Sequence, residues 1–438
     1  MKRTIEIAII TTALCTAHFG FAQTGFQGIV NQVKMRQKSG SRIVEIDYTL
    51  GNEPSIITLS IETNGVALPG DAVSHLTGDV NRVIEPGRHT ILWDAGTDWP
   101  EQVTERAKAH ITAWSLQNPP PYTAIDLSAG YAAQSYPIYY YPNAGAVPRG
   151  VTDDLYKTTH ILMRKVGPTD SGGFKMGSPR QERFREQVSA GSEIWHDVIL
   201  TKAYYLAIYE TTQYQWEMVM GDVVPRPSHF NQEADWQTRP VEQISYYHVR
   251  ELASNANDPL VEWPKNNKVN PNSFIGRIRA KTGIETSDLP TEAQWEYAAR
   301  AGNLGSIYDG TVNLTNFSAD ARLDALARYA HNQYGKVQGT QTEGQTAKVG
   351  SYLPNAWGFY DMLGNVKEFC LDYWNPPVLP DSVIDPKGPT EAKEREFRVG
   401  RGGGYNNEAA YCRLSAQTYV GPHWAVPSTG FRLAFTLQ

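Results

Sequence analysis

The chain has 438 residues, a net charge of −6, 41% hydrophobic residues and 20% charged residues. This composition is typical of a globular protein and excludes a disordered one, and the length leaves room for two domains. Because no dense run of Lys and Arg interrupts the negative balance, the sequence excludes nucleic acid as the expected partner, which requires a concentrated basic face.

The first 22 residues have the pattern of a secretory signal peptide. Lys2 and Arg3 precede an apolar stretch, and Gly20 and Ala22 are small residues at the −3 and −1 positions of a cleavage site. No later segment approaches the about 20 apolar residues that a bilayer span needs. We therefore expect a secreted or periplasmic protein that does not span a membrane.

Residues 24–116 are expected to form an immunoglobulin-like β-sandwich. Apolar and polar residues alternate in four short runs separated by Gly, Pro and Asn: 43–50, 55–63, 89–96 and 109–114. Short alternating runs between turn residues favour antiparallel strands packed as two sheets. The next segment, 117–159, is rich in Pro, Gly and Tyr, which predicts a linker with one strand near 123–127.

The second domain, 160–438, is expected to have an α+β fold. Two helices begin with a Thr whose partner Gln lies three residues later, a capping box: Thr212 with Gln215, and Thr291 with Gln294. Gly221 and Gly302 are predicted to end these helices, and the Trp in each is predicted to lie in the core. The remaining sequence consists of short strand patterns and long loops rich in Gly, Pro and Asn.

Long motifs of this domain follow one another in a fixed order: GGFKMGSP, VILTKAYYLAIYETTQYQWEMVMG, RPVEQISY, LPTEAQWEYAARAG, LPNAWGFYDMLGNVKEF, RVGRGGGY and GFRLAF. In this order they resemble the sulfatase-modifying-factor domain of the formylglycine-generating enzyme family. The resemblance implies an irregular fold related to C-type lectins for residues 160–438, and it does not cover the β-sandwich.

The resemblance also implies a chemistry. In that family two cysteines near the C-terminus bind copper, activate oxygen and convert a cysteine of a sulfatase to formylglycine. The matching positions of this chain are Asn407 for the first cysteine and Cys412 for the second, while Gly404 takes the place of a serine and Lys367 that of a tryptophan. An amide oxygen does not replace a thiolate in holding soft Cu(I), so we do not expect copper.

Three interpretations of Cys412 stay open. Cleavage of the signal peptide would leave Cys370 and Cys412, and two cysteines in an exported chain favour one disulfide. In the fold that the resemblance implies, Cys370 lies on a segment beside the Arg-Gly-Gly strand. The other interpretations are two buried free thiols, and a reactive, catalytic Cys412.

The resemblance further implies calcium. In YDMLGNVKEF the family's ligands, two side chains and two backbone carbonyls, fall on Asp361, Gly364, Val366 and Glu368. Calcium prefers about six to eight oxygen ligands, and this turn supplies part of that shell. The alternative is that Asp361 caps the turn and that Glu368 pairs with an arginine such as Arg398 or Arg401. A second calcium site of the family would begin at two positions: Asn316 and the carbonyl of Phe317.

The C-terminal loops that line the family's substrate groove carry aromatic, amide and acidic residues: Tyr405, Asn406, Asn407, Glu408, Tyr419, His423 and Trp424. Such side chains suit stacking on, and hydrogen bonding to, a peptide or a sugar, although they are alternatively ordinary loop residues. Two functions stay open: a non-catalytic exported module that binds a peptide or glycan and keeps a calcium site, and an oxidoreductase that converts a cysteine of an exported sulfatase to formylglycine. We favour the first, because Gly404, Asn407 and Lys367 depart from the residues that carry the chemistry.

Overall fold

The structure is a computed structural model, and it describes residues 28–104, 106–189, 193–221, 223–251, 269–333, 336–337, 340–341, 344–374, 382–389 and 397–438. The predicted signal peptide, 1–22, lies outside these residues. The described chain divides into two compact units: the first holds residues up to Ala124 and Ile138–Asp153, and the second holds Ile125–Pro137 and Asp154–Gln438. Within the described ranges, every helix is too short or too polar to cross a bilayer.

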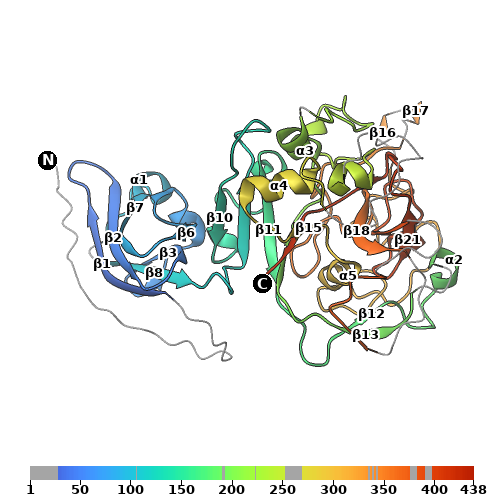
Figure 1. Ribbon diagram of the computed structural model, residues 1–438, viewed down its shortest axis with the longest axis horizontal. Coiled ribbons are helices and arrows are strands. Elements are labelled where there is room, and N and C mark those ends of the chain that lie inside the picture. Colours follow the sequence, from blue (N-terminus) through green and yellow to red (C-terminus); the bar gives the residue numbers. More distant parts are fainter. Residues whose placement is uncertain are drawn as a thin grey trace. The chain divides into compact units, whose positions relative to one another are not determined.

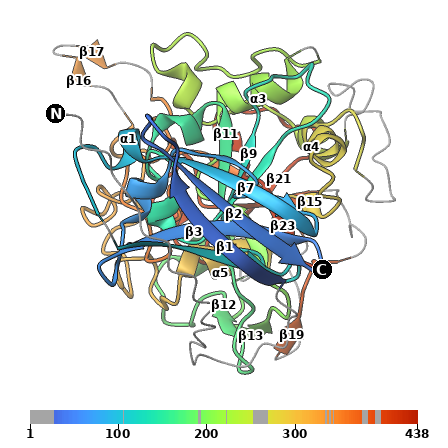
Figure 2. The ribbon, with the colours of Figure 1, turned by 90° about the vertical axis from the view of Figure 1, so that its left-hand side faces the viewer.

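The sandwich of the first unit is formed by β1 (Ile29–Gln37), β2 (Ile43–Gly51), β3 (Ser55–Thr63), β4 (Val66–Ala67), β5 (Leu76–Gly78), β6 (Val83–Ile84), β7 (Gly87–Asp94) and β8 (Ala107–Trp114). One sheet has the order β1-β2-β7-β5, and in the other β3 pairs with β4, β6 and β8. Figure 2 shows β1, β2 and β7 side by side in the first sheet. These pairings correspond to the A-B-E-D sheet and the C–F pair of the immunoglobulin fold, so the predicted β-sandwich is confirmed.

Strand β2 shows how the alternation builds this sandwich. Every second residue is buried: Val44, Ile46, Tyr48 and Leu50. These side chains share one core with Ile57 and Ile61 of β3 and with Trp93 of β7. The four predicted strands are therefore present, whereas β1 escaped prediction because most of its residues are exposed and its alternation is irregular.

The segment 117–159 contains β9 (Tyr122–Asp126) and β10 (Ile138–Tyr141), so a strand is present near 123–127 as predicted. Ile125, Leu127 and Tyr136 are buried in a core of the second unit, and the Tyr136 hydroxyl donates to the carbonyl of Met218 at 2.9 Å. Part of the segment predicted as a linker thus belongs to the second unit, because its apolar side chains pack there.

The second unit has two main sheets. The first follows the antiparallel order β11-β14-β23-β15, formed by β11 (His160–Val166), β14 (Tyr204–Ala207), β15 (Ser287–Asp288) and β23 (Ala434–Thr436). The second has the order β21-β20-β18-β22, formed by β18 (Lys367–Tyr373), β20 (Arg398–Arg401), β21 (Gln417–Val420) and β22 (Thr429–Gly430). Five short strands form two small sheets: β12 (Phe174–Met176), β13 (His196–Ile199), β16 (Lys336–Val337), β17 (Thr340–Gln341) and β19 (Ser382–Ile384).

The described α-helices are α1 (Ala95–Asp98) in the first unit and α2 (Arg185–Ser189), α3 (Gln213–Met220), α4 (Phe274–Thr282) and α5 (Glu292–Arg300) in the second. Both predicted capping boxes are present, at the start of α3 and of α5. Gly221 caps the end of α3, as predicted, whereas α5 ends at Arg300 and is capped by Ala301, whose φ of 46° is left-handed, one residue before the predicted Gly302. Helix α4 was not predicted.

Helix α5 positions the candidate site. Trp295 of α5 and Trp216 of α3 are both completely buried, as predicted. Helix α5 packs against β18 and β20, of which Figure 1 labels β18, and its apolar face shares one core with residues of both strands. The second unit is therefore an α+β domain in which α5 supports the strands that carry the glycine run and Cys370.

Candidate functional site

The glycine run that follows β20 forms a closely packed turn. Gly402 and Gly403 have φ values of 87° and 72°, in the left-handed region that glycine adopts without strain. A Cβ at Gly402 would lie 3.2 Å from the Trp295 ring, and one at Gly403 would lie 2.9 Å from Cys412 Sγ. The turn is therefore in direct contact with α5 and with the sulfur of Cys412.

Cys412 ends a short 3-10 helix, Ala409–Cys412, and is completely buried. Burial raises the pKa of its thiol to about 12. Cys370 of β18 is also completely buried, and burial, together with the carboxylates of Glu292 and Asp372, raises its pKa well above the usual range. Both thiols are therefore protonated at neutral pH, and a buried, protonated thiol is inert.

The predicted Cys370–Cys412 disulfide is wrong, because both cysteines are free. The sulfur of Cys412 faces Gly403, whereas the thiol of Cys370 is close to the carboxylates of Glu292 and Asp372. The two sulfurs thus have different neighbours within one core. The interpretation as two buried free thiols is confirmed.

Asn407, at the position of the family's first cysteine, closes the turn. Its Oδ1 accepts a hydrogen bond from the N–H of Gly404 at 2.9 Å, and its own N–H donates to the carbonyl of Gly404 at 2.9 Å. A Cβ at Gly404 would lie 2.9 Å from the carbonyl oxygen of Ser428, which leaves no room for the serine of the family. Because Asn407 offers an amide where a second thiolate would be needed, the residues around Cys412 do not fit a two-thiolate copper site.

Lys367, at the position of the family's tryptophan, begins β18. Its side chain crosses Gly400 of β20, where an added Cβ would lie 2.7 Å from Lys367 Cδ. Burial lowers the pKa of its ammonium group. The aliphatic part of the Lys367 side chain therefore occupies the position where the family has an aromatic ring.

The two side chains predicted to bind calcium have protein partners. Asp361, with a φ of 55°, accepts a hydrogen bond from the N–H of Gly350 at 2.6 Å. Glu368 binds Arg432, whose Nε lies 2.7 Å from Oε2, and accepts a hydrogen bond from Trp295 Nε1 at 2.8 Å. Asp361 therefore caps a turn and Glu368 pairs with an arginine, although not with either of the two arginines expected.

A third buried carboxylate, Glu210, interacts with this pair. Its oxygens accept hydrogen bonds from the N–H of Val366 at 3.0 Å and from Asn365 Nδ2 at 2.5 Å. Burial, Asp361 and Glu368 raise the pKa of Glu210 well above its usual range, and burial raises the pKa of Asp361 to about 6. This concentration of carboxylates favours a cation, but no group of three or more His, Cys, Asp or Glu among the described residues is arranged to hold a metal ion. Calcium stays a prediction at Asp361, Gly364, Val366 and Glu368.

The second predicted calcium position is held by local hydrogen bonds. Asn316 Oδ1 accepts from the N–H of Ser318 at 2.8 Å, and the carbonyl of Phe317 accepts from the N–H of Ala410 at 2.9 Å. The Phe317 ring also packs edge-on against Tyr411. These contacts attach the loop to the 3-10 helix of Cys412, and calcium at Asn316 and Phe317 likewise stays a prediction.

The first group of predicted groove residues, 405–408, mainly supports the turn. Tyr405 is buried, with its ring centroid 5.4 Å from that of Phe230, so it is not an exposed groove residue. Glu408 accepts a hydrogen bond from Ser318 Oγ at 2.6 Å. Asn407 closes the turn, and Asn406 is the one exposed residue of this group.

The second group, which is exposed, belongs to a cluster that we call the aromatic patch. It consists of the exposed residues Tyr419, His423 and Trp424 and the half-buried residues Trp374 and Phe397. The ring centroids of Phe397 and Tyr419 lie 4.8 Å apart, those of Trp374 and Tyr419 5.8 Å, and those of Phe397 and Trp424 5.5 Å. Tyr419 is 48% exposed and Trp424 38%. Sequence reasoning missed Trp374 and Phe397, which lie at the paired ends of β18 and β20 and are joined by a backbone hydrogen bond of 2.7 Å.

The fold and the turn around Cys412 define a known class of protein. Residues 163–437 match the family described as the Sulfatase-modifying factor enzyme 1-like domain. Because this match covers more than half of the chain, the chain belongs to that family. The membership predicted from the motifs is confirmed.

Particular relatives share parts of the chain. It is 29% identical over 249 residues to a protein named Chaperone protein LppX from Paenibacillus barcinonensis, covering 52% of this chain and 79% of that protein. It is 33% identical over 153 residues to the Formylglycine-generating enzyme of Mus musculus, and this match covers 33% of this chain but only 38% of the enzyme. Among solved structures, Treponema denticola variable protein 1 is similar at 26% identity with a TM-score of 0.45, covering 63% of this chain and 95% of that one.

Proposed function

We propose that the protein is an exported, non-catalytic member of the sulfatase-modifying-factor family that binds a peptide or a glycan through the aromatic patch. The observation that carries this proposal is the state of Cys412, which is completely buried and has a thiol pKa raised to about 12. Thiol oxidation chemistry starts from an accessible thiolate. Asn407 supplies no second thiolate to activate it.

The aromatic patch supports a binding role. Exposed Tyr and Trp rings offer large apolar faces with a polar edge, a combination enriched where proteins bind ligands. The rings of Phe397, Tyr419 and Trp424 already pack against one another, so ordering them on binding costs little conformational entropy. The similarity to a protein that carries the name of a chaperone is in keeping with this role.

A binding screen tests the proposal. The protein would be applied to immobilised glycans and to peptides, together with the variants Tyr419→Ala and Trp424→Ala. We expect each variant to lose binding by about 10-fold or more, as for aromatic anchors at other interfaces. Tyr131→Ala removes an aromatic ring that is 46% exposed outside the patch, and it should bind normally. Equal binding by wild type and both patch variants contradicts the proposal.

The second candidate function is a formylglycine-generating oxidoreductase, favoured by the similarity to enzymes of that name. Incubation of the protein with Cu(I), oxygen and a cysteine-containing peptide of sulfatase type would test it. We expect no aldehyde in the peptide by mass spectrometry. Aldehyde formation that Cys412→Ser abolishes would establish the enzymatic function instead.

A further inference from the structure

A cavity of about 330 Å³ lies in the second unit, and none of the predicted site residues lines it. A volume of this size suits a small organic ligand. Part of its wall is apolar, formed by Met176, Ala293 and Val383. Its acidic lining comes from separate segments: Glu193, Glu292, Glu296 and Asp372.

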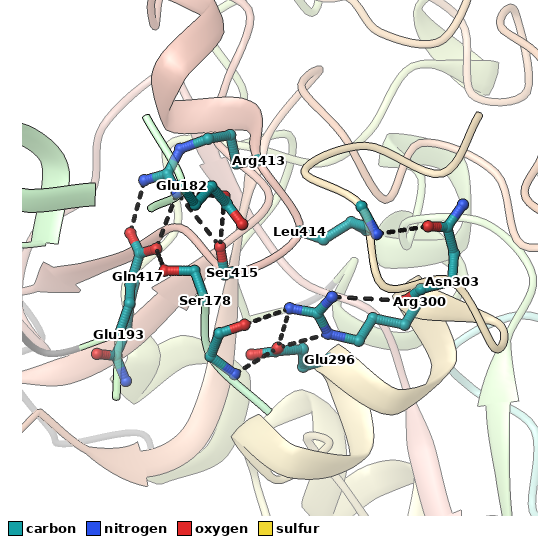
Figure 3. Close-up of polar contacts among 12 residues, drawn as sticks. Ser178, Glu182, Glu193, Glu296, Arg300, Asn303, Arg413, Leu414, Ser415 and Gln417 are labelled. Carbon is teal, nitrogen blue, oxygen red and sulfur yellow. Dashed lines mark hydrogen bonds and ion pairs between the residues drawn. The ribbon is translucent and has the colours of Figure 1, made fainter. Parts of the chain in front are cut away.

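Two of these carboxylates are balanced by buried arginines. Arg413 binds Glu193 through two hydrogen bonds of 2.8 and 2.6 Å, and Arg300 Nε binds Glu296 at 2.7 Å (Figure 3). The other oxygen of Glu296 pairs with Arg401 of β20. The charges of Glu193 and Glu296 are therefore compensated within the protein.

Glu292 and Asp372 are not balanced in this way. Glu292 Oε1 accepts from Gln417 and lies 3.3 Å from Arg401, which Glu296 already engages. No described residue donates a hydrogen bond to its second oxygen, Oε2, although Glu292 is only 9% exposed. Asp372 is 4% exposed, accepts the backbone N–H of Glu292 at 2.7 Å and forms no ion pair with a described residue.

The pKa values of Glu292 and Asp372 reflect the incomplete compensation of their charges. Burial raises the pKa of Glu292 to about 8 against the opposing effect of Arg401, and burial raises the pKa of Asp372 to about 6. Without a ligand cation, Glu292 therefore holds a proton at neutral pH. The other charged or titratable groups that face this pair or line the cavity are Glu193, Glu296, Arg398, Arg401, His196, Lys387, Tyr373 and Cys370.

We propose that this cavity binds a small organic cation, with an ammonium group between the carboxylates of Glu292 and Asp372 and an apolar body against Met176 and Val383. An ammonium group needs only the few acceptors that these carboxylates provide. A metal ion fits less well, because the described residues include no group of three or more His, Cys, Asp or Glu arranged to hold one. The site is separate from the aromatic patch and does not rest on its function.

Isothermal titration calorimetry with the full chain tests the proposal. Benzylamine represents a free amine, and Nα-acetyl-lysine N-methylamide represents the lysine side chain of a peptide. We expect at least one of them to bind, and the one that binds identifies the source of the cation. Benzyl alcohol, the neutral counterpart of benzylamine, should bind at least about 10-fold more weakly than the ammonium probe, because charge-assisted hydrogen bonds are lost. Failure of both ammonium probes, or equal binding of the alcohol, overturns the proposal.

Variants and pH provide a second test. Glu292→Gln and Asp372→Asn should each weaken ammonium binding about 10-fold, whereas Glu285→Gln, at an exposed carboxylate outside the cavity, should not change it. Because Glu292 must lose its proton to receive the cation, affinity should rise from pH 6 to its pKa of about 8 with release of a proton. Glu292→Gln should lose this dependence while its thermal unfolding shows a folded protein. Affinity that is independent of pH in the wild type contradicts the proposal.

Discussion

Replacement of Arg413 by methionine tests whether buried ion pairs hold the C-terminal loops in place. The guanidinium is completely buried and binds Glu182 at 2.6 Å and Glu193 at 2.8 and 2.6 Å, while its Nε donates to the carbonyl of Ala410 at 3.0 Å. Methionine retains the aliphatic stem but leaves two carboxylates buried without this cation. Removal of one partner from a buried ion pair costs about 3–5 kcal/mol. We expect the upper end of that range, because two carboxylates lose their partner.

The loss should appear as a lower Tm in differential scanning calorimetry. For a domain of this size, about 1 kcal/mol corresponds to roughly 2–4 °C, so a decrease of about 10 °C or more is expected. Burial raises the pKa of Glu182 even beside Arg413, and the substitution should raise it further. A raised pKa in the folded state means that stability falls as pH rises from the unfolded value of about 4.3 towards the folded value. The destabilisation should therefore be smallest at acidic pH and largest at neutral pH.

The control is the triple variant in which Arg413→Met is combined with Glu182→Gln and Glu193→Gln. This variant leaves none of the three charges of the network buried without a partner, so it should recover part of the lost stability, although the buried amides of the two glutamines still need hydrogen-bond partners. A loss below about 1 kcal/mol in the single variant, or an equal loss at acidic and neutral pH, would refute the assigned role of the ion pairs.

Three further predictions concern the thiols, the calcium prediction and a helix cap. Iodoacetamide should label neither Cys370 nor Cys412 in the native protein, and it should label both after denaturation without reductant. Mass spectrometry of the intact protein counts the labels. Labelling that requires a reductant would indicate a disulfide. About 1 mM calcium should raise the Tm relative to EDTA, and Asp361→Asn should remove the increase; the same wild-type Tm in both conditions contradicts a calcium site. Thr291→Ala should lower the free energy of unfolding, measured with urea, by about 1 kcal/mol because α5 loses its N-cap. If the decrease is no larger than that of the control Thr286→Ala, the cap contributes little to stability.

The parts of the fold that could be predicted are those with local signals. Strand β2 alternates because one of its faces is buried, and the capping boxes of α3 and α5 need only residues three positions apart. Helix α4 carries a signal of the same kind, with Ser273 as its N-cap and Gly283 in a left-handed conformation after its last residue. It could therefore have been found from the sequence.

The site depended on contacts between distant segments, which no local pattern reports. Glu368 pairs with Arg432, which lies 64 residues later in the chain. Neither the spacing nor the composition of the sequence predicts this pair. Trp374 and Phe397 enter the aromatic patch only because β18 and β20 pair and bring their ends together. The disulfide prediction rested on the number of cysteines and on the neighbouring segments that the resemblance implies, whereas the packing of each sulfur within the core decides the outcome.

The residues of the family motif that this chain retains stabilise the fold, and this role does not require catalysis. Arg401 pairs with Glu296 and donates to the carbonyl of Leu414 at 2.8 Å, and Gly402 fits against Trp295, where a side chain would be crowded. These contacts join α5, β20 and the C-terminal loop. Asn407, one of the departures, supplies a hydrogen bond that closes the turn but no sulfur for copper. A match to the motif is therefore evidence for the fold, whereas evidence for oxidation must come from the donor atoms beside Cys412.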